Sequence, residues 1–170
     1  MKSGIFAAMV LGLSVTLGGC GFTPLYGKPE SGANVPAEFA AISVEDIDGR
    51  VGLEVRNNLI EILNPAGEPA SPAYRLVVTL GELRQGLLVR SDASVTRYNY
   101  QLSGKYELRD AKTDKVMQQG EARAIAAYNV VESQFATYSA EKDAESRAAR
   151  ELAQEIRLRL GTALKLAEHK

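Results

Sequence analysis

Residues 97–109 read RYNYQLSGKYELR, and apolar and polar side chains alternate along this run. The positions that face one way are aromatic or aliphatic: Tyr98, Tyr100, Leu102, Tyr106 and Leu108. The positions between them are polar or charged: Arg97, Asn99, Gln101, Ser103, Lys105, Glu107 and Arg109. A period of two is typical of a strand with one buried face and one wet face. The run therefore predicts a strand in a sheet that is covered on one side.

The segments on either side extend this sheet. Upstream, residues 74–80 alternate in the same way, and Ser91-Asp92-Ala93 predicts the turn between the two strands. Gly81 and Gly86 suggest bulges or bends in the upstream strand. Downstream, residues 110–114 predict a hairpin loop before a third strand, Val116–Tyr128. Small residues fill one face of that strand and would let a helix approach closely: Gly120, Ala122, Ala124 and Ala126.

Two further segments have helical periodicity. Residues 39–47 are mostly small or β-branched and predict a first strand, after which Asp48 can cap a helix. An apolar stripe then follows: Val51, Val55, Leu59, Ile62 and Leu63. Asn64-Pro65 and Gly67 predict the end of this helix. A second helix is expected from Ser139 to about Leu166, with a stripe that includes Ala144, Ala148, Leu152, Ile156 and Leu160.

The expected order is β-α-β-β-β-α. The first two strands can lie parallel through a right-handed crossover, and the next strands form a meander. This order predicts an α/β two-layer sandwich in which two helices pack on one face of a four-stranded mixed sheet. The other face bears Arg97, Asn99, Gln101 and Lys105, and is polar enough to meet water or a partner.

The N-terminal residues predict export. Lys2 gives a short basic region, and residues 5–17 are apolar or small without a charge. That run is shorter than the roughly 20 residues needed to span a bilayer, and it fits a secretory signal. The run ends in Leu17-Gly18-Gly19-Cys20, which has the form of a bacterial lipobox. The alternative is an ordinary signal peptide with an incidental Cys.

The lipobox divides the chain into three parts. Residues 1–19 are the expected lipoprotein signal peptide, 20–38 the lipidated Cys20 with a flexible tether rich in Gly and Pro, and 39–168 a single α/β domain. Two or more acyl chains on Cys20 would hold the protein stably at a membrane. The absence of Asp at position 21 favours the outer membrane of a Gram-negative bacterium.

Composition excludes most site chemistry. The chain has one Cys and one His, and a formal net charge of −1. It therefore offers no cysteine-based zinc site, no disulfide framework and no general drive toward nucleic acid. No nucleophile–base pair, metal cluster or phosphate loop is visible, so we expect no enzyme activity, no metal and no cofactor.

Residues 19–27 read GCGFTPLYG. This string resembles the start of mature lipopolysaccharide (LPS)-assembly lipoproteins of the LptE family, in which the lipobox Cys is followed by Gly, Phe, a variable residue, Pro, Leu and Tyr. The element order extends the resemblance over residues 39–168. The resemblance implies a non-enzymatic protein that plugs and helps assemble an LptD-type β-barrel, the LPS translocon, in a one-to-one complex. It also implies assistance to LPS insertion at the cell surface, and a location on the periplasmic side or in the barrel lumen.

Two sets of residues are candidates for contacts with partners. Docking to the barrel is expected of Asn99 and Gln101 and of the motif Phe22, Leu25 and Tyr26. The alternative for this motif is that its side chains pack on the domain or lie at the membrane surface. Three bases near the expected turn are candidates for contacts with LPS phosphates: Arg84, Arg90 and Arg97. The alternative for these bases is that they are solvating charges on the surface of the hairpin. The alternative function for the whole chain is that of an auxiliary periplasmic lipoprotein of another transport or secretion system.

Overall fold

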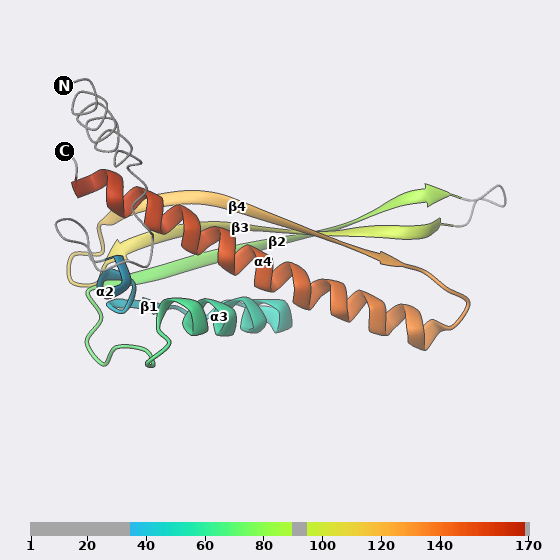
Figure 1. The fold of residues 1–170 in the computed structure, drawn as a ribbon, viewed down its shortest axis with the longest axis horizontal. Coiled ribbons are helices and arrows are strands. Elements are labelled where there is room, and N and C mark those ends of the chain that lie inside the picture. The colour runs from blue at the N-terminus through green and yellow to red at the C-terminus, as the bar shows by residue number, and fades with distance from the viewer. Residues whose placement is uncertain (1–34, 90–94, 169–170) are drawn as a thin grey trace, which may run out of the picture.

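The computed structural model describes residues 35–89 and 95–168. The elements, in chain order, are α2 (Val35–Phe39), β1 (Ile42–Val44), α3 (Gly49–Leu63), β2 (Tyr74–Val89), β3 (Val95–Asp110), β4 (Val116–Asn129) and α4 (Gln134–Glu168). Figure 1 shows an elongated molecule in which α3 and α4 lie over the same side of a long, twisted sheet.

The sheet has the order β1-β2-β3-β4. β1 pairs with β2 in parallel, from Ile42↔Tyr74 to Val44↔Leu76. β2 and β3 form a long antiparallel hairpin, and β3 pairs antiparallel with β4 along nearly its whole length. The predicted two-layer α/β fold and its four-stranded mixed sheet are thus confirmed.

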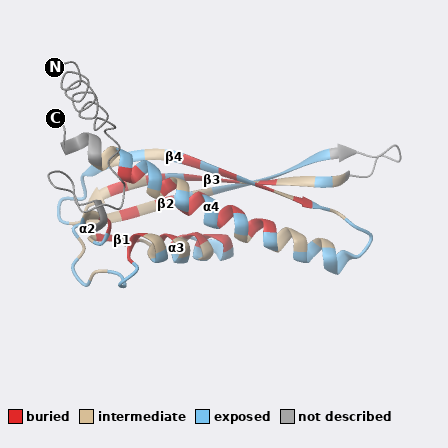
Figure 2. Ribbon diagram, viewed as in Figure 1, coloured by how far each residue is buried: buried red, intermediate tan, exposed pale blue. Residues whose placement is uncertain are grey.

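The core lies between the helices and one face of the sheet, which we call the inner face. On β3 the even-numbered residues Tyr100, Leu102, Tyr106 and Leu108 are buried there, as the alternation predicted. The helices contribute the predicted stripes, including Val55 and Leu59 of α3 and Leu152, Ile156 and Leu160 of α4. Figure 2 shows the buried residues concentrated where the helices overlie the sheet, whereas the far end of the hairpin is exposed.

Small residues bring α4 close to the sheet. A Cβ placed on Gly104 would lie 3.1 Å from Cδ2 of Leu152, so the missing side chain sets the approach of α4 to β3. Ala122, Ala124 and Ala126 of β4 are buried under the same layer, as expected. Gly120 differs from that expectation, because a Cβ there would lie 2.5 Å from the hydroxyl oxygen of Tyr106. Gly120 therefore makes room for a tyrosine and not for a helix.

The N-terminal part of the fold differs from the prediction. The strand expected at 39–47 is only Ile42–Val44, and Phe39 ends the short helix α2 instead. α2 begins at Val35, inside the range expected to be tether. The buried Phe39 ring explains this helix, because α2 carries it into the core. The Asn64 amide, which is buried, donates a 3.2 Å hydrogen bond to the carbonyl of Phe39.

The ends of the other elements mostly follow the sequence. Asp48 occupies the N-cap position of α3, although its side chain makes no capping hydrogen bond. The ladder shifts register just after Gly86, as expected, but it is regular at Gly81. α4 begins at Gln134 and not at Ser139. Ser133 explains the earlier start, because its Oγ accepts a 3.3 Å hydrogen bond from the N–H of Ala136.

The turn between β3 and β4 is built on Asp110. Its Oδ1 accepts hydrogen bonds from the N–H groups of Lys112 (3.0 Å) and Thr113 (2.8 Å). These bonds favour the charged carboxylate and lower the pKa of Asp110, those from Thr113 foremost. The other expected turn, Ser91-Asp92-Ala93, lies outside the described residues.

Candidate functional site

The sheet face turned away from the helices, which we call the outer face, carries two of the predicted docking residues. Asn99 and Gln101 of β3 both lie on it and are half-buried. Each sits between neighbours on β2 and β4: Gln85 and Ala127 beside Asn99, and Leu83 and Ile125 beside Gln101. The structure therefore confirms which way these side chains face, while their role in docking stays a prediction.

Two exposed apolar residues on this face were missed by sequence reasoning. Leu83 is 53% exposed and Ile125 is 50% exposed, and both pair in register with Gln101. They form a row across three strands that is apolar at both ends and polar in the middle. The sequence did contain a signal for these two residues, because each is an apolar residue at an outward-facing position of its strand. The outer face is thus a mixed surface, which is typical of the rim and core of protein interfaces.

The structure separates two of the three arginines proposed to contact LPS. Arg84 lies on the inner face, because it pairs in register with the buried Tyr100, whereas Arg97 is exposed on the outer face. Arg90 lies outside the described residues. The two described arginines are therefore on opposite faces of one hairpin, and they do not form a single cluster.

Arg84 is held by contacts within the chain. Its Nε donates a 2.7 Å hydrogen bond to Glu141 and its Nη2 a 3.0 Å hydrogen bond to Glu145, both on α4. The hydrogen bond to Glu141 is the main cause that raises the pKa of Arg84. The guanidinium also lies 5.3 Å from the ring centroid of Tyr100. Burial is the main cause that raises the pKa of this tyrosine.

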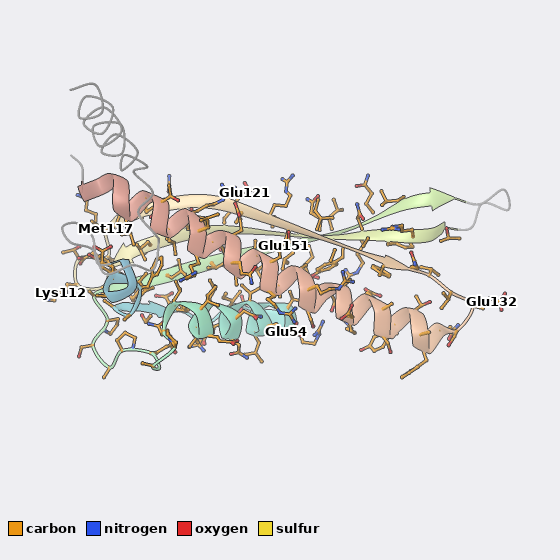
Figure 3. All side chains as sticks on the ribbon, viewed as in Figure 1. Glu54, Lys112, Met117, Glu121, Glu132 and Glu151 are labelled. Atoms are coloured by element: carbon orange, nitrogen blue, oxygen red, sulfur yellow. The ribbon has the colours of Figure 1, made fainter. Side chains whose placement is uncertain are left out.

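Glu145 is the centre of this network and was not singled out from the sequence. Its side chain is 1% exposed, and three cations from three elements contact it: Arg50 of α3, Arg84 of β2 and Lys142 of α4. A second carboxylate, Glu54 at the start of α3 (labelled in Figure 3), also contacts Arg50. Burying a charged carboxylate is costly unless cations pair with it, as they do here. The network therefore joins the two helices to the middle of the hairpin.

The outer half of the hairpin is mostly exposed, although Arg84 still contacts α4. On β2 the last buried residue is Val78, and residues 81–87 are all exposed. β3 has no buried described residue before Tyr100. The outer part of the hairpin thus extends past the buried core (Figures 1 and 2).

A second exposed apolar group lies where β4 passes into α4. Val131 is 51% exposed, Phe135 80% and Tyr138 59%. The backbone here is held in place, because the Thr137 hydroxyl both accepts from the N–H of Val131 and donates to its carbonyl, each at 3.1 Å. Figure 3 labels Glu132 in this connection, at the end of the molecule opposite Met117 and Lys112. Sequence reasoning missed this group because it placed the start of the helix after it.

The remaining predicted site residues fall outside the described residues. These are Cys20, Phe22, Leu25 and Tyr26. Within residues 35–89 and 95–168, no group of three or more His, Cys, Asp or Glu side chains could hold a metal ion. No helix in those ranges combines the length and apolarity needed to cross a membrane.

Comparisons with known proteins agree with this geometry. The sequence model of LptE, described as lipopolysaccharide-assembly, matches residues 39–160. No curated protein sequence matches the chain at a significant level. Among solved structures, a protein of Caulobacter crescentus CB15 described as a lipoprotein is similar, with 28% identity and a TM-score of 0.66 over 76% of this chain and 95% of that one.

Two more distant structures share the fold. Rare lipoprotein B of Shewanella oneidensis has 12% identity and a TM-score of 0.55, over 72% of this chain and 92% of that one. A minor lipoprotein of Acinetobacter baumannii has 15% identity and a TM-score of 0.54, with the same coverage of both chains.

Proposed function

The chain belongs to the LptE family of lipopolysaccharide-assembly proteins, and we propose on that basis that it is the lipoprotein partner of the LPS translocon β-barrel in the outer membrane. In this role it plugs the barrel, helps it assemble and assists LPS insertion at the cell surface. The complex is one-to-one, and Cys20 anchors the protein in outer-membrane lipid. The proposed role needs no catalytic group, metal or cofactor.

The observation that carries the proposal is the one-sided sheet. α3 and α4 cover the inner face, while the outer face stays open and mixes amides with apolar side chains. The open face includes Asn99 and Gln101 beside Leu83 and Ile125. A surface of this kind suits a close contact with a wall that is itself polar, as the interior of a large outer-membrane barrel is.

LPS contact is proposed for the bases of the hairpin. Arg97 is exposed on the outer face and free to meet a phosphate, and Arg90 belongs to the same expected turn region. Arg84 is 42% exposed while it is bound to Glu141 and Glu145. We therefore expect Arg97 and Arg90 to contribute more to LPS contact than Arg84, whose main contacts are within the chain.

Co-purification from detergent-solubilised outer membrane tests the barrel contact. We expect the wild-type chain to retain a large β-barrel protein in equal amount, and the double variant Gln101→Arg with Ile125→Arg to lose most of it. Leu158→Arg is the matched control, because Leu158 is 57% exposed on α4, away from the outer face. Recovery of a periplasmic or inner-membrane machine in place of a barrel would favour the alternative role in another transport system.

A further inference from the structure

The edge of β2 that faces β1 has no strand paired with it along most of its described length. β1 pairs only with Tyr74, Arg75 and Leu76, so from Val77 onward no described strand lies on that side of β2. Figure 1 shows β2 continuing far past the end of β1. An unpaired edge of this length is a template for another strand.

The backbone groups that face this edge can be identified from the β1 contact. The carbonyl of Leu76 accepts a 3.0 Å hydrogen bond from the N–H of Glu45, so Leu76 faces β1. Strand geometry repeats every two residues, and Val78, Leu80, Glu82 and Arg84 therefore present their N–H and C=O groups to the same edge. The ladder with β3 is regular over these residues and shifts only after Gly86.

We propose that this edge pairs with the same edge of a second copy of the chain, antiparallel and centred on Leu83. The two sheets then join into one, with both outer faces on the same side. This dimer goes beyond the proposed role at the barrel and does not depend on it.

Charge complementarity favours a second copy as the occupant, in the register centred on Leu83. With Leu83 opposite Leu83 of the second copy, Glu82 lies opposite Arg84 of the second copy, and Arg84 opposite Glu82. A shift of the centre to Glu82 or to Arg84 would place two like charges opposite each other, which is unfavourable. Both side chains are partly exposed, Glu82 39% and Arg84 42%, although within the chain they contact each other at 3.8 Å and Arg84 also contacts Glu141 and Glu145.

The register also makes the contact chemically testable. The backbone N–H and C=O groups of Leu83 point to β3 and not to the β1 side of β2. The pair formed by Leu83 and Leu83 of the second copy is therefore a non-hydrogen-bonded pair, whose side chains lie close together. Two cysteines at such a pair can form a disulfide. Cys20 is the only Cys in the chain, so a full chain that carries Cys20→Ser and Leu83→Cys has one thiol.

The experiment compares Leu83→Cys with Ile125→Cys, both in the full chain with Cys20→Ser, purified in detergent without any barrel. Both side chains are about half exposed on the outer face. In the proposed dimer, however, the two copies of residue 125 lie five strand spacings apart, or about 24 Å. We expect Leu83→Cys to form the disulfide dimer at least about tenfold faster, because pairing raises the effective thiol concentration.

Glu82→Pro provides a second variant that keeps the test clear. It removes an N–H that faces the open edge and leaves the bonds to β3 intact, as proline does at edge strands. We expect this variant to fold and to sediment as a monomer under conditions where the Cys20→Ser chain sediments as a dimer. Equal disulfide rates for the two cysteine variants, or a monomer for the parent chain at all concentrations, would overturn the proposal.

Discussion

Arg84 on β2 and Glu145 on α4 lie 61 positions apart in sequence and are joined by a 3.0 Å hydrogen bond from Nη2 to Oε1. The carboxylate is buried, whereas the arginine is 42% exposed. The pair therefore marks the boundary between the packed half of the molecule and the open half of the hairpin. Contacts on the α4 side of this boundary stabilise the fold, whereas residues 81–87 on the other side are exposed.

Replacing Glu145 with Gln is expected to destabilise the fold. Arg50, Arg84 and Lys142 would lose the carboxylate that they share, and the buried amide could not replace its charge. We expect a loss of about 2–4 kcal/mol in the free energy of unfolding, measured in urea, since one partner of a buried ion pair is removed. Glu151→Gln, on the exposed side of the same helix (Figure 3), should change it by less than about 0.5 kcal/mol. Equal effects at the two positions would show that the network contributes little.

Gly104 and Gly81 form a matched pair of glycines in neighbouring strands. A side chain at position 104 would press on Leu152 and Ile156 of α4, whereas one at position 81 would meet only the hydroxyl of Ser103. Gly104→Val should therefore lower the free energy of unfolding by about 1–3 kcal/mol through overpacking. Gly81→Val should change it little, since its neighbour can rotate away. Thermal unfolding of both variants gives the comparison, and a larger loss at Gly81 would contradict it.

The two faces of β3 should respond differently to truncation. Leu102 is fully buried and Gln101 is half-buried on the outer face. Leu102→Ala should cost about 2–5 kcal/mol through lost burial and the cavity it leaves, and Tyr100→Ala a similar amount. Asn99→Ala and Gln101→Ala should leave the melting temperature nearly unchanged. Unfolding of the isolated protein by the amide variants would mean that these residues serve stability and not a partner.

LPS binding should depend on the exposed bases of the hairpin. Arg90→Ser with Arg97→Ser should weaken binding of LPS to the full chain in detergent by roughly tenfold, because each exposed ion contact is worth about 0.5–1 kcal/mol. The loss should be larger at low salt than at high salt. Arg123→Ser with Arg150→Ser removes the same charge from β4 and α4 and is the control. Equal losses in the two double variants would indicate a general charge effect.

Cys20→Ser should abolish acylation, because serine lacks the thiol that accepts the lipid. Metabolic labelling with a palmitate analogue measures this, and label that persists on the variant would refute the prediction. Part of the function should survive if the domain is also held in the barrel by a large interface. The amount of barrel that co-purifies with the unlipidated chain reports that remainder.

The long periodic segments could be predicted from the sequence because burial alone determines them. The alternation of residues 97–109 identified the inner face correctly, since a shift by one residue would have exposed Tyr100 and Leu102. The apolar stripe of α3 was equally clear. The order of the elements then left few topologies for a mixed four-stranded sheet.

The parts that could not be predicted depend on contacts between distant segments. β1 is short because only three residues reach β2, and α2 forms because Phe39 finds a place in the core. In the sequence, Glu145 cannot be told apart from the surface acids of its helix. Its role becomes clear only in the fold, where Arg50 and Arg84 lie beside it. Likewise, the three arginines of the hairpin lie close together in the sequence. Only the position of α4 shows that Arg84 stabilises the fold, through its hydrogen bonds to Glu141 and Glu145.

The parallel pairing of β1 with β2 has a mechanical consequence. Any tension on the N-terminal segment enters the fold at α2, beside the start of β1 (Figure 1). A pull along the axis of β1 would load its three residue pairs with β2 together, in shear. The Asn64–Phe39 hydrogen bond lies at the same end and shares this load. The N-terminal end of the fold therefore resists such a pull with three residue pairs and this hydrogen bond, whereas the hairpin is held by ladders along nearly its whole length.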